Sequence, residues 1–170
     1  MAERSQNDSA LVNLSERLTN SAAFSNLFRE GMDLVEETAA YLDGDGRTEA
    51  KALERSVSLT YATESMRLTT RLMQLASWLL LHRAVKEGEM TLTQANREKT
   101  KVKLSAADPG PEDMISKLPQ QLQDLISRSM NLQSRVRRLD TSIHAPVTER
   151  APIGNPLVPQ LNRLKAAFER

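Results

Sequence analysis

The sequence predicts an all-α protein, built as an elongated three-helix bundle. Hydrophobic residues make up 39% of the chain and aromatic residues only 4%, so Leu, Ala, Val and Met must form the core, as in packed helices. Apolar residues recur at helical spacings in three long segments. The length of 170 residues suits one bundle with appendages. We therefore expect a frayed N-terminal segment (residues 1–20), a helical bundle domain (residues 21–144) and a flexible, Pro-rich C-terminal tail (residues 145–170).

The first helix is expected over residues 21–42. Its apolar positions recur at spacings of three, four and seven, at Phe24, Leu27, Phe28, Val35, Ala39 and Leu42. The following sequence, Asp43-Gly44-Asp45-Gly46, combines two glycines with two short polar residues, as is typical of a turn between antiparallel helices.

A long second helix is expected from a cap at Thr48 to Glu87, with Gly88 as its C-terminal stop and a possible break near Ser56. It carries one apolar stripe at Val57, Tyr61, Leu68, Leu72, Leu75 and Leu79, and a second beside it at Leu59, Ala62, Met66, Met73, Ala76 and Leu80.

The second half of this helix is apolar almost all round, so several neighbours must cover it. Two helices of the same chain do not suffice for this, which favours a homodimer. The residues assigned to a dimer or core surface are Leu68, Leu72, Leu75, Trp78 and Leu79.

A weak, polar helix is expected from a cap at Thr91 or Thr93 to about Leu104, followed by a loop at residues 108–111. The last long helix then covers residues 112–142 and is reinitiated at Pro119. Its buried face comprises Leu118, Leu122, Leu125, Ile126, Leu132, Val136 and Leu139.

The tail cannot continue this helix, because four prolines recur between Pro146 and Pro159. Helical spacing returns near the C-terminus, in a possible short recognition helix whose candidate partner-binding residues are Leu157, Leu161, Leu164 and Phe168. The alternative is that the tail is an inert, solubilising extension.

The residue types needed for catalysis are scarce. The chain has no cysteine and only two histidines, His82 and His144, so thiol chemistry and His-rich metal sites are excluded. His82 is expected at a helix end or an interface. Phosphate-binding and nucleophile-elbow motifs are absent, and the acidic turn at residues 43–46 lacks the later ligands of a calcium loop. We therefore expect no enzyme, no cofactor and no metal.

Charge is nearly balanced, with 23 basic and 22 acidic residues, so the chain as a whole does not attract nucleic acid or a membrane surface. A local group of arginines on the last helix keeps a DNA-binding alternative open; it comprises Arg128, Arg135, Arg137 and Arg138. Glu64, Arg67 and Arg71 are expected either to pair within the chain or to face a partner. The N-terminus lacks a secretion pattern, and the longest apolar stretch is too short for a membrane span, so we expect a cytoplasmic protein.

Two sequence blocks carry a resemblance to a known family. They are residues 28–44, FREGMDLVEETAAYLDG, and residues 61–81, YATESMRLTTRLMQLASWLLL, followed by Arg83-Ala-Val. These blocks resemble the RcdA family (regulator of CtrA degradation) of alphaproteobacteria, and the resemblance extends over about residues 10–145.

The resemblance implies a homodimeric, elongated three-helix bundle with a disordered tail. It also implies a non-enzymatic adaptor that delivers substrates, such as cell-cycle transcription regulators, to a ClpXP protease primed by a response regulator. A cyclic-di-GMP-binding partner would extend the substrate range, and the protein would be recruited to a cell pole. A DNA-binding or transcription-associated helical dimer, and a structural dimer with partners unrelated to proteolysis, remain the alternatives.

Overall fold

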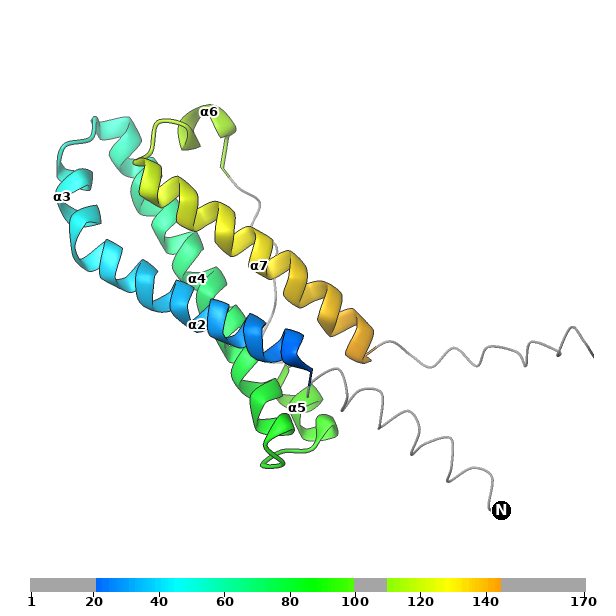
Figure 1. Ribbon diagram of the computed structural model, residues 1–170. Coiled ribbons are helices and arrows are strands. Elements are labelled where there is room, and N and C mark those ends of the chain that lie inside the picture. Colours follow the sequence, from blue (N-terminus) through cyan, green and yellow to red (C-terminus); the bar gives the residue numbers. More distant parts are fainter. Residues whose placement is uncertain (1–20, 100–109, 145–170) are drawn as a thin grey trace, which may run out of the picture.

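The structure, a computed structural model, describes residues 21–99 and 110–144. In these ranges it contains helices and no strands, which confirms the predicted all-α fold (Figure 1). The helices are α2 (Ala22–Asp43), α3 (Asp45–Lys51), α4 (Arg55–Lys86), α5 (Leu92–Lys99), α6 (Glu112–Ile115) and α7 (Gln120–His144).

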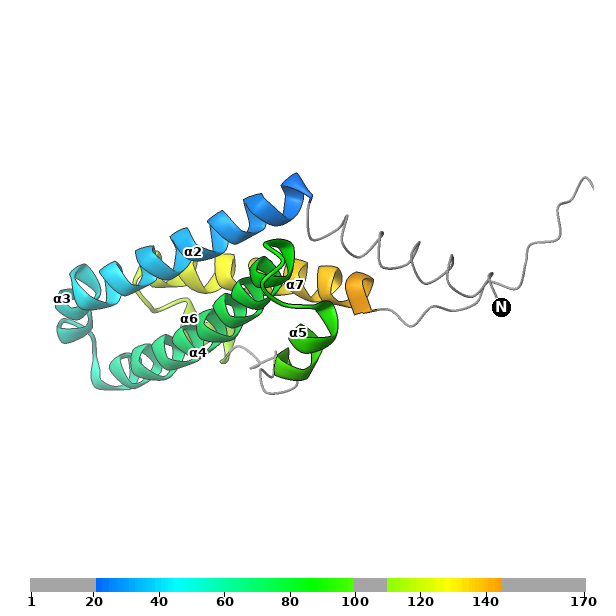
Figure 2. The same ribbon diagram turned by 90° about the horizontal axis from the view of Figure 1, so that it is seen from below.

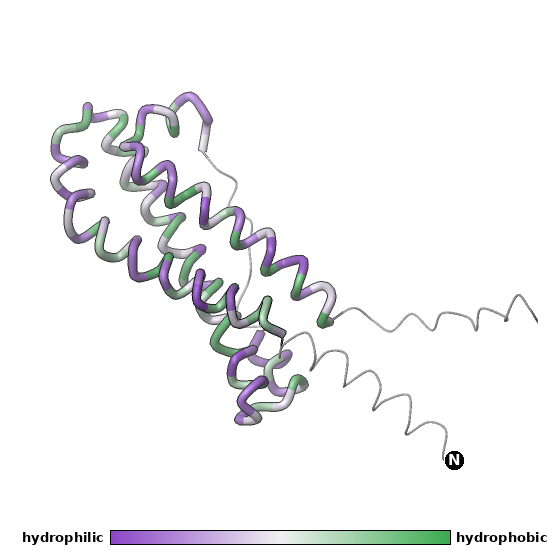
Figure 3. The backbone as a smooth tube through the Cα atoms, in the orientation of Figure 1, coloured by the Kyte–Doolittle hydropathy of each residue, from purple (hydrophilic) through white to green (hydrophobic). Residues whose placement is uncertain are grey.

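Three long helices, α2, α4 and α7, pack against one another along an elongated bundle (Figures 1 and 2). The short helix α3 lies at one end of the bundle and α5 at the other. Hydrophilic and hydrophobic residues alternate along the long helices (Figure 3). Helices α2 and α7 are amphipathic, whereas α4 also carries exposed apolar residues. The fully buried side chains of the shared core include Phe24, Leu34, Leu68, Leu75, Trp78, Leu79, Leu122, Leu125, Leu132 and Val136.

A glycine sets the spacing of the three long helices. Gly31 of α2 is buried, and a Cβ atom placed there would lie 2.5 Å from Leu79 Cδ1 and 3.6 Å from Leu132 Cδ2. The missing side chain thus makes room for residues of both α4 and α7. This close approach fixes where α2 crosses the other two helices.

The connection between the first two long helices differs from the prediction. The chain breaks at Gly44 and then forms α3, so Thr48 lies inside a helix and does not cap the second long helix; α4 begins at Arg55 instead. Tertiary packing favours α3 over an open turn. A Cβ atom on Gly46 would lie 2.7 Å from the Tyr41 carbonyl oxygen and 2.7 Å from the Tyr61 hydroxyl, and the Tyr41 hydroxyl donates a 2.7 Å hydrogen bond to Glu49 Oε2.

The other helix boundaries agree with the sequence signals. Ser21 caps α2 by accepting a hydrogen bond from the Phe24 amide, and Gly88, with φ of 75°, follows the end of α4. Thr91 and Gln94 cap α5 reciprocally, since each side chain accepts from the other's backbone amide. The break before Pro119 is confirmed, while residues 100–104 of the predicted third segment lie outside the described residues.

None of the helices in the described part of the chain is long and apolar enough to cross a membrane.

Candidate protein-binding surface

The structure buries the five α4 residues that the sequence assigned to a dimer or core surface. Leu68, Leu72, Leu75, Trp78 and Leu79 are all at most 3% exposed within a single chain. They belong to the bundle core and are not accessible to a partner. The candidate partner-binding residues of the tail, Leu157, Leu161, Leu164 and Phe168, lie outside the described residues. A surface for partners must therefore be sought elsewhere on the bundle.

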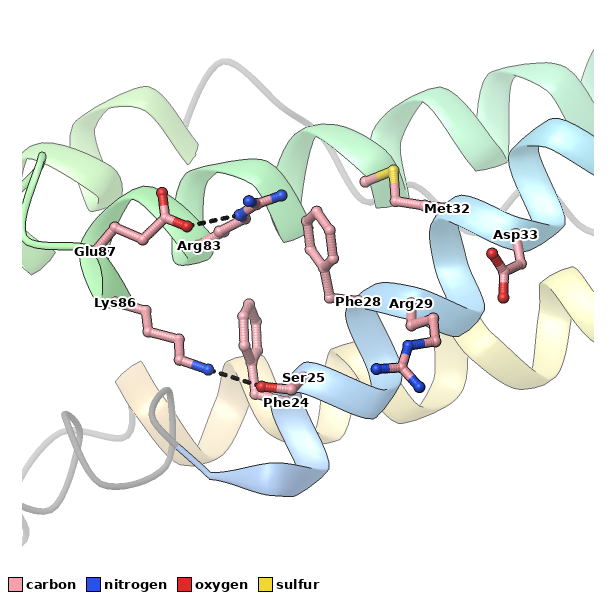
Figure 4. Close-up of a pocket in the computed structure, with 9 residues that line it drawn as sticks. All are labelled: Phe24, Ser25, Phe28, Arg29, Met32, Asp33, Arg83, Lys86 and Glu87. Atoms are coloured by element: carbon pink, nitrogen blue, oxygen red, sulfur yellow. Dashed lines mark hydrogen bonds and ion pairs between the residues drawn. The ribbon is translucent and has the colours of Figure 1, made fainter.

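A pocket of about 400 Å³ lies where the first turns of α2 meet the last turns of α4 (Figure 4). Phe24 and Phe28 point from α2 toward α4 and form its apolar part. Phe24 is buried against Trp78, with ring centroids 6.3 Å apart, whereas Phe28 remains partly exposed. The lining residues are Phe24, Ser25, Phe28, Arg29, Met32, Asp33, Arg83, Lys86 and Glu87.

Cationic side chains surround the apolar part of this pocket. The guanidinium carbon of Arg83 lies 4.9 Å from the centroid of the Phe28 ring. The Nε atom of Arg83 donates a 2.9 Å hydrogen bond to Glu87 Oε1. Lys86 Nζ donates to Ser25 Oγ over 2.7 Å, which links α4 to α2. Arg29 completes the cationic part of the lining, and Asp33 and Glu87 add two carboxylates to it.

The pocket lining combines apolar and charged side chains, which are the kinds of group that contact a peptide. Its phenyl rings and Met32 offer apolar contact, and its cations offer hydrogen bonds to carboxylates. Its lining holds no histidine or cysteine. Elsewhere in the described residues, no group of three or more His, Cys, Asp or Glu side chains is placed to hold a metal ion.

The Glu64, Arg67 and Arg71 group pairs within the chain. Arg67 Nη1 lies 2.6 Å from Glu64 Oε1, which also accepts a 3.3 Å hydrogen bond from the Gly110 amide. Arg71 donates a 2.8 Å hydrogen bond to Ser129 of α7. Burial lowers the pKa of the Arg71 guanidinium, while the nearby Glu64 carboxylate opposes that shift. This group ties α4 to α7 and to the segment before α6, so its role within the bundle is structural.

His82 lies one turn before the end of α4, as the sequence suggested, but it is buried in the core of a single chain and does not lie at an interface. It is fully buried, stacks on the Trp78 indole with centroids 3.9 Å apart, and its Nδ1 atom lies 2.9 Å from the Trp78 carbonyl oxygen. Helical geometry explains the difference: His82 lies one turn after Trp78 and therefore on the same inward side of α4.

Two of the arginines that suggested a DNA-binding alternative form ion pairs with α2. Arg128 lies 2.7 Å from Glu37 Oε2, and Arg135 lies 2.7 Å from Glu30 Oε2. The hydrogen bond from Arg128 lowers the pKa of the Glu37 carboxyl and raises that of the guanidinium. These charges join α7 to α2 and are already neutralised by carboxylates.

Comparisons with known proteins place the chain in a family. Residues 15–168 match the model of a protein family of unknown function, DUF1465. Among solved structures, the chain is similar to RcdA from Caulobacter crescentus CB15, with 49% sequence identity and a TM-score of 0.64 over 77% of this chain and 98% of that one. This chain belongs to the RcdA family. A comparison with curated proteins gives no match.

The match to the family model covers more of this RcdA-family chain than the helical bundle predicted from the residue patterns. It extends to residue 168 and so includes most of the segment predicted as a tail. Sequence reasoning did not identify the pocket, because its lining comes from residues 24–33 and 83–87, which only folding brings together. One available signal was that two of the three phenylalanines of the chain, Phe24 and Phe28, lie one helical turn apart.

Proposed function

We propose that this protein is a non-enzymatic adaptor that binds other proteins and delivers substrates to the ClpXP protease in cell-cycle-regulated proteolysis. The observation that carries the proposal is the similarity to RcdA, at 49% identity over 98% of that chain. Its partners would be a second copy of itself, ClpXP with a response-regulator adaptor, and transcription-regulator substrates. It would act in the cytoplasm, with recruitment to a cell pole.

An adaptor of this kind accelerates degradation by raising the local concentration of a substrate near the unfoldase, so each separate contact needs only modest affinity. The chain offers two candidate contacts. The pocket between α2 and α4 suits an apolar side chain flanked by a carboxylate. The tail residues Leu157, Leu161, Leu164 and Phe168 have the spacing of a helix that binds in a groove.

The deciding experiment measures degradation of candidate transcription regulators by purified ClpXP, with the response-regulator adaptor present, with and without this protein. We expect faster loss of at least one substrate when the protein is added. A chain that changes no degradation rate, binds neither ClpX nor the response regulator, and retains DNA with a steep salt dependence would refute the proposal in favour of the DNA-binding alternative.

The pocket can be tested separately in the same assay. Arg29→Glu combined with Lys86→Glu reverses two cations of its lining, and we expect a fall in substrate delivery of about tenfold through weaker binding. Arg47→Glu combined with Lys51→Glu is the matched control, because both residues are exposed on α3 at the other end of the bundle. Equal delivery by the pocket variant and the control would remove the pocket from the proposal.

The tail is tested by truncation after Ala145. We expect the helical signal and the thermal midpoint to stay nearly unchanged while delivery of at least some substrates is impaired. Undiminished delivery by the truncated chain would contradict a role for the four tail residues and support an inert extension.

A further inference from the structure

The pocket between α2 and α4 lies beside the point where the chain enters α2. Its lining begins at Phe24, three residues after the N-cap Ser21, and continues along α2 to Asp33, over about 14 Å of helix. The backbone at Ser21 is extended, with φ of −69° and ψ of 152°, so the chain before it does not continue the axis of α2. Residues 1–20, which lie outside the described residues, are therefore attached next to the pocket.

Two of the three cations of the lining have no carboxylate partner among the described residues. Arg83 pairs with Glu87, but Lys86 Nζ contacts only the neutral hydroxyl of Ser25 (Figure 4). Arg29 forms no ion pair with another described residue, although Asp33 lies one helical turn after it. With three cations and two carboxylates, the lining is positive overall, and it suits a ligand with apolar groups and a surplus of carboxylates.

The segment before α2 has these two properties. Leu11, Leu14 and Leu18 are three and four residues apart, and the carboxylates of Asp8 and Glu16 lie beside them in sequence. Residues 1–20 carry three acidic and two basic residues in all. The segment therefore offers apolar side chains for the phenyl rings and a negative charge for the cations.

The C-terminal segment is less suitable, although it has similar apolar spacing. Residues 145–170 carry four basic and two acidic residues, and Arg163 and Lys165 lie among the apolar positions between Leu157 and Phe168. These cations would be repelled by the positive lining. Charge thus favours the N-terminal segment as the occupant.

The length of the connection also favours it. Seven residues separate Leu14 from Ser21, and a flexible chain of that length has a root-mean-square end-to-end distance of about 15 Å, which matches the extent of the α2 lining. A short tether of this kind gives an effective concentration on the order of millimolar. A weak contact is therefore enough to keep the pocket occupied.

We infer that the pocket binds residues 8–18 of its own chain, with leucines against Phe24 and Phe28 and carboxylates near Arg29 and Lys86. A partner peptide must then displace this segment before it can bind. The inference rests on the proposed function only for this consequence, which adds regulation to the pocket. Its tests contain neither protease nor substrate, so its failure and that of the proposed function are distinguishable.

The first test measures competition in the full-length chain. The probe is a fluorescein-labelled peptide of residues 8–19, and binding is followed by fluorescence anisotropy. Leu11→Ser combined with Leu14→Ser in the protein should release its own segment from the pocket. We expect this leucine variant to bind the peptide about tenfold more tightly than the unaltered chain does, because the competing intramolecular contact is lost.

Charge reversal then locates the binding site. Arg29→Glu and Lys86→Glu, added to the leucine variant, should weaken peptide binding about tenfold or more, because carboxylates replace the two unpaired cations. Arg47→Glu and Lys51→Glu, added instead to the leucine variant, are the matched control at exposed positions on α3, and they should leave the affinity of that variant unchanged. Peptide binding that the pocket reversal does not weaken would overturn the inference.

The matched control for the leucine substitutions lies in the other terminal segment. Leu157→Ser combined with Leu161→Ser makes the same chemical change there, and we expect the peptide affinity of the unaltered chain. Equal affinity of the unaltered chain and the leucine variant would overturn the inference, as would a peptide that binds none of these chains.

The second test places the segment directly, and it uses the absence of cysteine from the chain. A nitroxide spin label on Ser15→Cys should broaden the methyl resonance of Met32, which lines the pocket. The methyl resonance of Met66 should stay sharp, because Met66 lies about 25 Å from Arg83 along α4. Leu11→Ser combined with Leu14→Ser should restore a sharp Met32 resonance.

A mixed sample separates binding within one chain from binding between chains. It combines spin-labelled chains that have no observable methyl groups with methyl-labelled chains that have no spin label. We expect no broadening of Met32 in this mixture. Broadening as strong as in the doubly labelled chain would show that the segment binds a different chain, and a Met32 resonance that is sharp in every sample would show that it does not bind the pocket. Either result would overturn the inference.

Discussion

The inner and outer sides of α4 are made of similar apolar residues and have opposite environments. The inner side, with Leu68, Leu72 and Leu75, is at most 3% exposed and is covered by α2 and α7. The outer side carries Leu59, Met66, Met73 and Leu80, which are between 53% and 71% exposed. Composition does not separate the two sides. What separates them is whether other helices of the same chain cover the side chains, as α2 and α7 do on the inner side.

Polar contacts also distinguish the inner side, because they fix the position of its apolar residues. Trp78 Nε1 donates a 2.8 Å hydrogen bond to Asp140 of α7, and Arg71 donates to Ser129. On the outer side, the hydroxyls of Thr63, Thr69 and Ser77 donate to backbone carbonyls within α4 itself. The polar contacts of the inner side thus tie α4 to α7, whereas those of the outer side do not reach another helix.

The largest expected effect is a difference in unfolding free energy between substitutions at two adjacent residues, one on each side of α4. Leu72→Ala should lower the free energy of unfolding by about 2–5 kcal/mol, because it opens a cavity in the core. Met73→Ala should change that free energy by about 0.5 kcal/mol or less in the monomer, because the side chain is already 65% exposed. Urea denaturation followed by circular dichroism measures both changes.

Protein concentration is the control in this comparison. The loss from Leu72→Ala should be the same at low and high concentration, because a single chain buries this side chain. Equal, concentration-independent losses from the two variants would show that a single chain buries both sides of α4.

Periodicity was sufficient to predict the three long helices, since their apolar residues recur with a helical period whatever the packing. It also separated the two stripes of α4, but it could not assign one of them to the core, because Leu68 and Met66 have equally apolar surroundings in sequence. The cap at Thr48 was wrong because the close packing of Gly46 against Tyr41 and against Tyr61 of the next helix favours α3. The pocket could not be predicted from the sequence, because its lining depends on how α2 and α4 are arranged in space.

A smaller effect is expected from the polar contact that anchors the inner side. Asp140 accepts from Trp78 Nε1 and lies 2.6 Å from Lys99 Nζ, so it joins α4, α5 and α7. Asp140→Ala should lower the free energy of unfolding by about 1–3 kcal/mol, since it leaves the buried indole N–H unpaired. Asp140→Asn, which keeps an acceptor for Trp78 and loses the charge, should recover most of the loss. If the two variants are equally unstable, the Lys99 ion pair and not the indole contact is the anchor.

The smallest effect is expected where an ion pair joins two helices at the solvent-exposed surface. Arg128 lowers the pKa of Glu37 below its ordinary value of 4.5 in the folded chain, so this pair stabilises the fold fully above that value. The stabilisation is lost as the pH falls through the lowered pKa. Both side chains are more than 40% exposed, and solvent screening limits the contribution to about 0.2–1 kcal/mol. Glu37→Gln should therefore reduce stability slightly at neutral pH, and the difference from the unaltered chain should vanish in acid. Glu36→Gln, at the adjacent exposed residue, is the control, and urea midpoints measured from neutral pH into acid provide the comparison. A difference that persists below the lowered pKa would mean that Glu37 contributes through packing and not through its charge.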